Sequence, residues 1–112
     1  MTPKKIALTA RDLIEDKKGE EPLVLDVSKQ SSFAHYFVIT HGNSGPHVKA
    51  IAEHLMESFK KKKVTLFNKE GLVTGEWVVL DFGSVIVHVF HRDKREFYNL
   101  ESLWGDSKAV KK

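Results

Sequence analysis

The stretch EWVVLDFGSVIVHVFH, residues 76–91, contains two apolar runs that meet at Gly83. Both runs are rich in β-branched and aromatic residues, which favour strands, and a glycine between such runs is typical of a tight connection. The stretch therefore predicts two consecutive β-strands, 76–82 and 84–90, joined at a sharp turn.

The two faces of the first of these strands differ in chemistry, because side chains alternate between faces along a strand. One face is purely apolar and is expected to be core: Val78, Leu80 and Phe82. The other face combines an aromatic, an aliphatic and an acidic side chain: Trp77, Val79 and Asp81. Tryptophan is enriched at binding hot spots and a carboxylate pairs with Arg or Lys of a partner, so this face suits a contact surface. The alternative is that Trp77 packs under a helix and Asp81 only begins a turn.

The surest helix precedes this stretch, at 43–63. Its apolar residues recur at helical spacing: Val48, Ile51, Ala52, Leu55 and Phe59. Ser44 or Gly45 can cap it, Pro46 suits its first turn, and the lysines at its end complement the helix dipole.

Five further elements and a tail complete the expected order. Residues 4–19 have helical spacing, and strands are expected at 22–28, around 36–42 and at 64–68. A short helix or turn is expected at 92–106 and a frayed basic tail at 107–112. The order α-β-β-α-β-β-β-α predicts a single α/β domain over 1–112, with a mixed sheet of about five strands flanked by helices.

Composition limits the kinds of site that this chain can hold. The 112 residues include no cysteine, which excludes disulfides, iron–sulfur clusters and thiol nucleophiles. The apolar runs are too short to span a membrane and the N-terminus is too charged for a signal peptide, so a cytoplasmic protein is expected. The net charge is +3, yet residues 70–91 contain three acids and no Lys or Arg. The global charge suggests a nucleic-acid or ribosome-like setting, and the local charge suggests a basic partner surface.

The histidines do not predict a metal site. His88 and His91 are three residues apart in a strand, so they point to opposite faces, and His88 is expected to be buried and hydrogen-bonded. His47 and His54 lack a third ligand at suitable spacing. No metal and no cofactor are expected.

A second candidate site is the turn THGNSGPH, residues 40–47, where Gly42, Ser44 and Gly45 precede a helix. The free N–H groups of a helix N-terminus can bind phosphates. A nucleotide-transferring enzyme would also need paired carboxylates for Mg²⁺, and no D-x-D or D-x-E occurs in the chain. An ordinary capped helix start is the simpler interpretation, and no enzymatic activity is expected.

A third candidate is the lysine run at 60–63, which suits either a contact with RNA or a solvated helix end.

Several motifs together resemble the ribosome-silencing factor family, also called the Iojap-like family: LDVS, SSFAHYFVITHGNSGPHVKAIAEHL, GEWVVLDFGSVIVHVFH and REFYNLESLWGD. The resemblance covers about residues 5–106. It implies a nucleotidyltransferase-like scaffold without established transferase activity. It also implies binding to ribosomal protein L-fourteen of the large subunit, which blocks joining of the small subunit and represses translation.

The resemblance carries the family's pattern onto numbered positions of this chain. The positions are Asp26, Ser31, Ser32, Tyr36, Gly42, His47, Trp77, Val79, Leu80, Asp81, Gly83, His88, Phe90, Tyr98, Leu103 and Trp104. Among them, the candidate partner contacts are Trp77, Val79, Leu80, Asp81, Phe90 and Tyr98, although alternation assigns Leu80 to the core face. One departure is His35, where many relatives have an acid, so an acid-dependent role there is doubtful.

Two alternatives to ribosome silencing stay open. One is a nucleotide-binding or residual nucleotidyltransferase-like protein that uses the turn at Gly42–Gly45. The other is a stand-alone RNA-binding domain that depends on Lys60–Lys63. In the silencing hypothesis the same lysines make a peripheral contact with rRNA, and the apolar strip also allows a homodimer.

Overall fold

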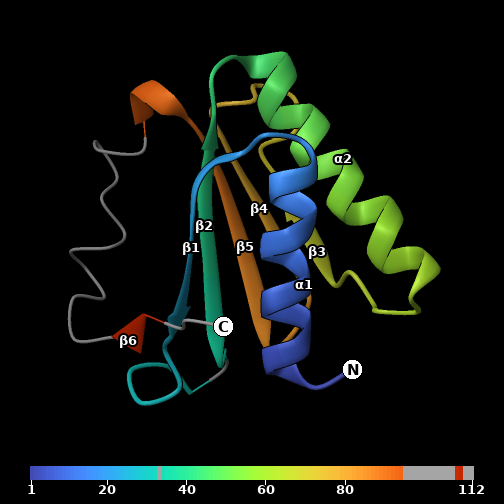
Figure 1. Ribbon diagram of the computed structural model, residues 1–112, viewed down its shortest axis with the longest axis vertical. Helices are drawn as coiled ribbons and strands as arrows, with labels where there is room; N and C mark the ends of the chain where they lie inside the picture. The colour runs from blue at the N-terminus through green and yellow to red at the C-terminus, as the bar shows by residue number, and fades with distance from the viewer. Residues whose placement is uncertain (33, 95–107, 110–112) are drawn as a thin grey trace.

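The computed structural model describes residues 1–32, 34–94 and 108–109. Within these residues, the elements in chain order are α1 Pro3–Asp16, β1 Glu20–Asp26, β2 Tyr36–Gly42, α2 Gly45–Lys61, β3 Asn68–Glu70, β4 Trp77–Asp81, β5 Val85–His91 and β6 Lys108–Ala109 (Figure 1). The chain therefore has the predicted α/β class, with β4 and β5 in the stretch that predicted two joined strands.

The strands form one mixed sheet in the order β3-β4-β5-β2-β1-β6. Only β2 and β5 are parallel neighbours, with Ile39 opposite His88, and the other pairs are antiparallel. The parallel pair arises because α2 returns the chain across the sheet before β3, β4 and β5 are added, and parallel neighbours need such a crossover.

Both helices lie on one face of the sheet (Figure 1). Their apolar stripes pack against alternate strand residues to form the main core, which includes Ile14, Leu55, Phe59, Val78 and Leu80, all at most 1% exposed. A second apolar cluster occupies the other face: Leu25, Val27, Ala34, Phe37, Ile39 and Phe90. Neither α1 nor α2 contributes a residue to this second cluster, so the two helices cover the main core only.

The start of α2 follows its sequence signals. The Ser44 hydroxyl accepts a hydrogen bond from the His47 N–H at 3.2 Å, and Pro46 lies in the first turn. Ser44 is thus the cap, because its oxygen replaces an acceptor that the first turn lacks.

The third strand lies four residues later than predicted. Lys63 has a φ of 62°, and the Val64 N–H donates to the Phe59 carbonyl, so the chain reverses at the end of α2, and residues 64–67 are not in a strand. The sheet is rejoined only at Phe67, whose N–H donates to the Asp81 carbonyl. The prediction of a strand at 64–68 was wrong because it relied on the β propensity of these residues, whereas the chain must first reverse direction after α2.

The C-terminal predictions fall largely outside the described residues. A helical turn begins at Arg92–Lys94, and the rest of the helix expected at 92–106 is not described. Lys108 and Ala109, inside the segment expected to be a frayed tail, pair with Asp26 and Leu25 of β1. Among the described residues, no helix has the length and apolar character needed to cross a membrane.

Candidate functional site

The predicted alternation along β4 is present in the structure. Val78 and Leu80 are fully buried beneath the helices, whereas Trp77, Val79 and Asp81 are each half-buried on the opposite face. The last three residues therefore retain surface that another molecule can reach.

Strand β3 extends this surface, because residues directly opposite in an antiparallel pair point to the same side. Asn68 lies opposite Asp81, and Glu70 lies opposite Val79. We call this set, Asn68, Glu70, Trp77, Val79 and Asp81, the Trp77 surface. Sequence reasoning did not join these two residues to the surface, because its strand ended at Asn68 and left Glu70 outside, although Glu70 is one of the three acids of residues 70–91.

The Trp77 surface carries two carboxylates and no cationic side chain. Lys69, between the two β3 members, lies opposite Leu80 and so points to the helix side of the sheet. This arrangement gives the surface a negative character within a chain of net charge +3. A cationic partner would therefore be attracted to it.

The indole of Trp77 is held in place from two sides. Its Nε1–H donates a hydrogen bond to His88 Nδ1 at 3.2 Å. Its ring stacks on Phe90, with centroids 5.2 Å apart and planes 25° apart. A fixed, half-buried aromatic ring loses little conformational freedom on binding, which favours its use as an anchor.

The histidine that holds Trp77 is itself buried, as predicted. Burial lowers the pKa of His88 to about 4, so the ring is neutral at pH 7. Since Nδ1 accepts from the indole, the proton of the neutral ring is assigned to Nε2. The Nε2 atom is buried, and no hydrogen-bond partner for it lies among the described residues.

Asp81 has a structural role as well as an exposed charge. Its Oδ1 accepts a hydrogen bond from the Gly83 N–H at 2.7 Å, and Gly83 adopts a φ of 88° in the β4–β5 turn. The alternative interpretation of Asp81 as a turn residue is thus also correct. The side chain remains half-exposed beside Asn68 and Ile86, its strand partners.

Three of the predicted contacts need separate comment. Leu80 and Phe90 are both 0% exposed, so the structure corrects their assignment as direct partner contacts. Leu80 belongs to the helix-side core, and Phe90 acts beneath Trp77 as its support. Tyr98, the remaining candidate, lies outside the described residues.

The turn at Gly42–Gly45 uses its polar groups internally. The Asn43 N–H donates to His47 Nδ1 at 2.9 Å, and the Val48 N–H donates to the Ser44 carbonyl at 3.0 Å. The His47 N–H is engaged by Ser44, and Pro46 has no N–H to offer. The N–H groups of Asn43, His47 and Val48 thus already have acceptors within the turn, which matches a capped helix start.

The helix histidines join the two helices. His47 Nε2 lies 2.8 Å from the Lys17 carbonyl oxygen, to which it donates, and His54 Nε2 lies 3.2 Å from Asp16 Oδ2. Both contacts tie the end of α1 to α2. Within the described part of the chain, no group of three or more His, Cys, Asp or Glu residues is placed to hold a metal ion.

Comparison with known proteins gives a consistent family. The family model described as "Ribosomal silencing factor during starvation" matches residues 1–112. The ribosomal silencing factor RsfS of Bacillus subtilis is 42% identical over 107 residues, covering 96% of this chain and 91% of the relative.

Two solved structures are similar to this chain in both fold and sequence. A crystal structure from Chromobacterium violaceum superposes with a TM-score of 0.91 at 36% identity, covering 94% of this chain and 88% of the other. One from Bacillus halodurans has a TM-score of 0.82 at 37% identity, covering 97% and 96%. The chain belongs to the ribosomal silencing factor (RsfS) family.

Proposed function

We propose that this protein is a ribosomal silencing factor that docks on the large ribosomal subunit in the cytoplasm and obstructs joining of the small subunit. The docking partner is ribosomal protein L-fourteen, as the family resemblance implies, and the contact is made by the Trp77 surface. Translation is repressed because the domain occupies space that the small subunit needs. No bond is made or broken, and no cofactor takes part.

The family match over the whole chain carries this proposal. The Trp77 surface supports it, since Glu70 and Asp81 present negative charge toward a partner and Trp77 presents an aromatic anchor. Proteins that bind rRNA are rich in Lys and Arg, so an acidic surface without cations suits one of them.

The expected energetics give Trp77 the largest share of the contact. A hot-spot aromatic contributes on the order of 2–4 kcal/mol, which corresponds to a loss of affinity of thirty-fold or more on truncation. A rim carboxylate contributes less to affinity and more to the association rate and its salt dependence.

The test is co-sedimentation with purified large subunits, supported by light scattering of subunit joining. Trp77→Ala should lose binding and fail to inhibit joining. Asp81→Asn keeps an oxygen that can accept from the Gly83 N–H while removing the charge, so its weaker binding would report charge alone. Glu53→Gln, an exposed acid on α2, is the matched control.

Circular dichroism must first show that each variant is folded. If folded Trp77→Ala and Asp81→Asn pellet with large subunits as efficiently as wild type, the Trp77 surface is not the docking site. If wild type neither pellets nor slows joining, the silencing function itself is wrong.

The nucleotide-binding alternative gains no support from the geometry, because the N–H groups of Asn43 and His47 already donate to acceptors within the turn. Titration calorimetry with Mg-ATP checks this point, and no heat of binding is expected at sub-millimolar concentration.

A further inference from the structure

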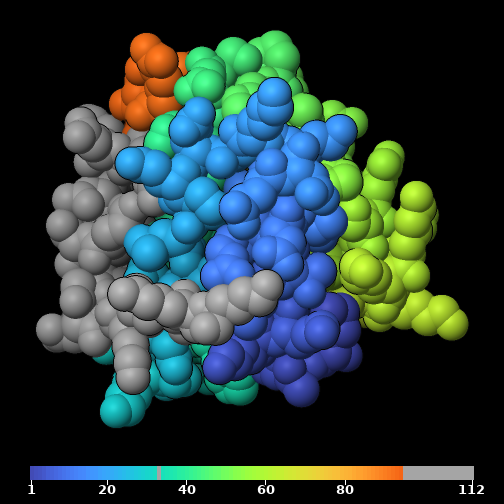
Figure 2. Space-filling model, in the orientation of Figure 1, coloured from blue at the N-terminus to red at the C-terminus, as the bar shows by residue number. Residues whose placement is uncertain are grey.

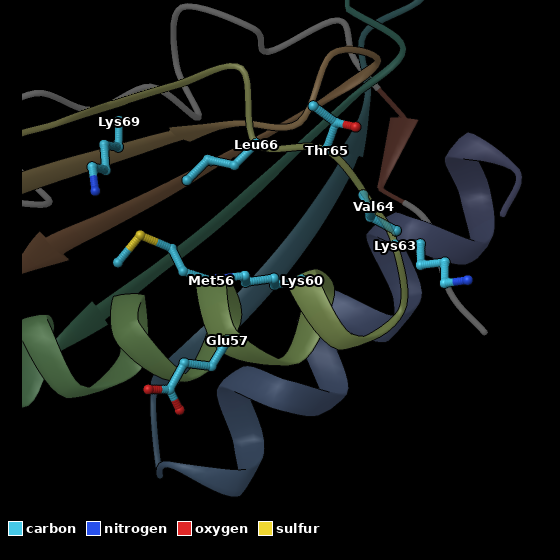
Figure 3. Close-up of a pocket in the computed structure, with 8 residues that line it drawn as sticks. All are labelled: Met56, Glu57, Lys60, Lys63, Val64, Thr65, Leu66 and Lys69. Carbon is cyan, nitrogen blue, oxygen red and sulfur yellow. The ribbon is translucent and has the colours of Figure 1, made fainter.

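An open pocket of about 590 Å³ lies where the end of α2 meets the segment that leads into β3 (Figure 3). Its lining residues are Met56, Glu57, Lys60, Lys63, Val64, Thr65, Leu66 and Lys69. The pocket is on the helix side of the sheet, since Lys69 lies opposite the buried Leu80, whereas Glu70 and Asp81 belong to the other side.

Three lysines line this pocket, and they come from a helix, a chain reversal and a strand. Lys60 belongs to the last turn of α2, Lys63 is the residue with a φ of 62° that reverses the chain, and Lys69 is the middle residue of β3. All three are exposed. Within the described residues, none of the three forms an ion pair. The pocket thus concentrates positive charge that the fold itself does not neutralise.

The single acid of the pocket does not cancel this charge. Figure 3 shows the Glu57 carboxylate on the side of α2 away from the segment that carries Leu66. Met56 points the opposite way, toward Leu66, so the floor between the lysines is apolar. Met adapts its shape readily to a bound group.

An exposed aromatic ring adjoins the pocket in the chain. Phe67 follows the lining residue Leu66 and is 68% exposed, and its ring lies against Gly83, where an added Cβ would approach it to 3.0 Å. Lysines combined with an apolar floor and an aromatic side chain are typical of surfaces that bind single-stranded nucleic acid.

We propose that this lysine pocket binds the phosphate backbone of unpaired RNA, with an unstacked base against the apolar floor. The absence of arginine from the lining favours RNA over an acidic protein segment. Carboxylates are recognised best by the bidentate guanidinium, whereas lysine binds phosphate as a point charge. The inference rests on the proposed function for its setting, a ribosome surface where RNA lies beside protein, but its chemistry can be tested without ribosomes.

The test is fluorescence anisotropy with a labelled 15-nucleotide oligouridylate. Three phosphate contacts to a single strand give a slope of about −2 for the logarithm of affinity against the logarithm of salt, or a loss of roughly 20-fold between 50 and 200 mM. Lys60→Gln/Lys63→Gln/Lys69→Gln should remove that slope. The matched control is Lys4→Gln/Lys5→Gln/Lys29→Gln, which removes the same charge from exposed lysines elsewhere.

Each outcome decides the proposal. A loss of slope confined to the pocket variant supports it, whereas equal losses in both triple variants show attraction by net charge only and overturn it. Binding of a poly-glutamate peptide as tightly as RNA would also overturn it, in favour of an acidic protein. Trp77→Ala should bind the oligonucleotide as wild type does. If the oligonucleotide does not bind the pocket, but large subunits still bind in a way that depends on Trp77, the pocket proposal is wrong and the proposed function stands.

Discussion

Two adjacent residues of β4, Val79 and Leu80, illustrate how one strand serves two faces. Leu80 is fully buried under the helices, where shape complementarity determines stability. Val79 is half-buried on the Trp77 surface, between Glu70 on one neighbouring strand and His88 on the other. Truncation on the helix face should therefore lower the free energy of unfolding, whereas truncation on the Trp77 surface should weaken binding to a partner.

The largest effect is expected from truncating the core residue. Leu80→Ala should destabilise the fold by about 2–5 kcal/mol, because it leaves a cavity among rigid neighbours. Val79→Ala should cost less than about 1 kcal/mol, since its site is open on one side. Urea unfolding of both variants measures the contrast, and equal losses of stability would show that both faces of β4 contribute equally to the core.

A second effect is a pH dependence of the free energy of unfolding that arises from His88, which lies behind Trp77. The folded pKa of His88 is lowered from 6.5 to about 4 by burial, so between these values the unfolded chain binds a proton that the folded chain does not. The free energy of unfolding should therefore fall as the pH drops from 6.5 to 4, by up to about 3 kcal/mol. Stability at pH 7 and above should not depend on this group.

Urea unfolding at pH 7, 5.5 and 4.5 tests the prediction, with His88→Gln as the comparison because it cannot take up a proton in this range. The slope of stability against pH should be smaller in His88→Gln. An unchanged slope would mean that other groups govern the acid sensitivity.

The smallest of the three effects concerns the bond between the indole and His88. Trp77→Phe keeps an aromatic ring over Phe90 but removes the Nε1–H donor, so it should cost about 1 kcal/mol of stability. A double-mutant cycle with His88→Phe isolates the pairwise contribution, which should be close to that value. A coupling energy near zero would show that stacking alone positions Trp77.

Figure 2 shows the helix side of the molecule, where atoms of α1 adjoin those of α2.

Differences between the two sides of the sheet were only partly visible in the sequence. Alternation in residues 76–82 separated the buried from the half-buried residues correctly, since a strand has a fixed period of two. Phe90 became a candidate contact through the family resemblance, and its depth could not be predicted from alternation because it depends on which strands flank it, and β5 lies inside the sheet.

The sequence alone predicted the α/β class, the place of α2 with Ser44 as one of two candidate caps, and the two faces of β4, because each depends on local periodicity or local hydrogen bonding. Three further features came from the three-dimensional structure: β3 begins at Asn68, Glu70 joins Asp81 on one surface, and Trp77 donates a hydrogen bond to His88. These features depend on strand order and register, which join residues far apart in the chain and so leave no periodic signal in it.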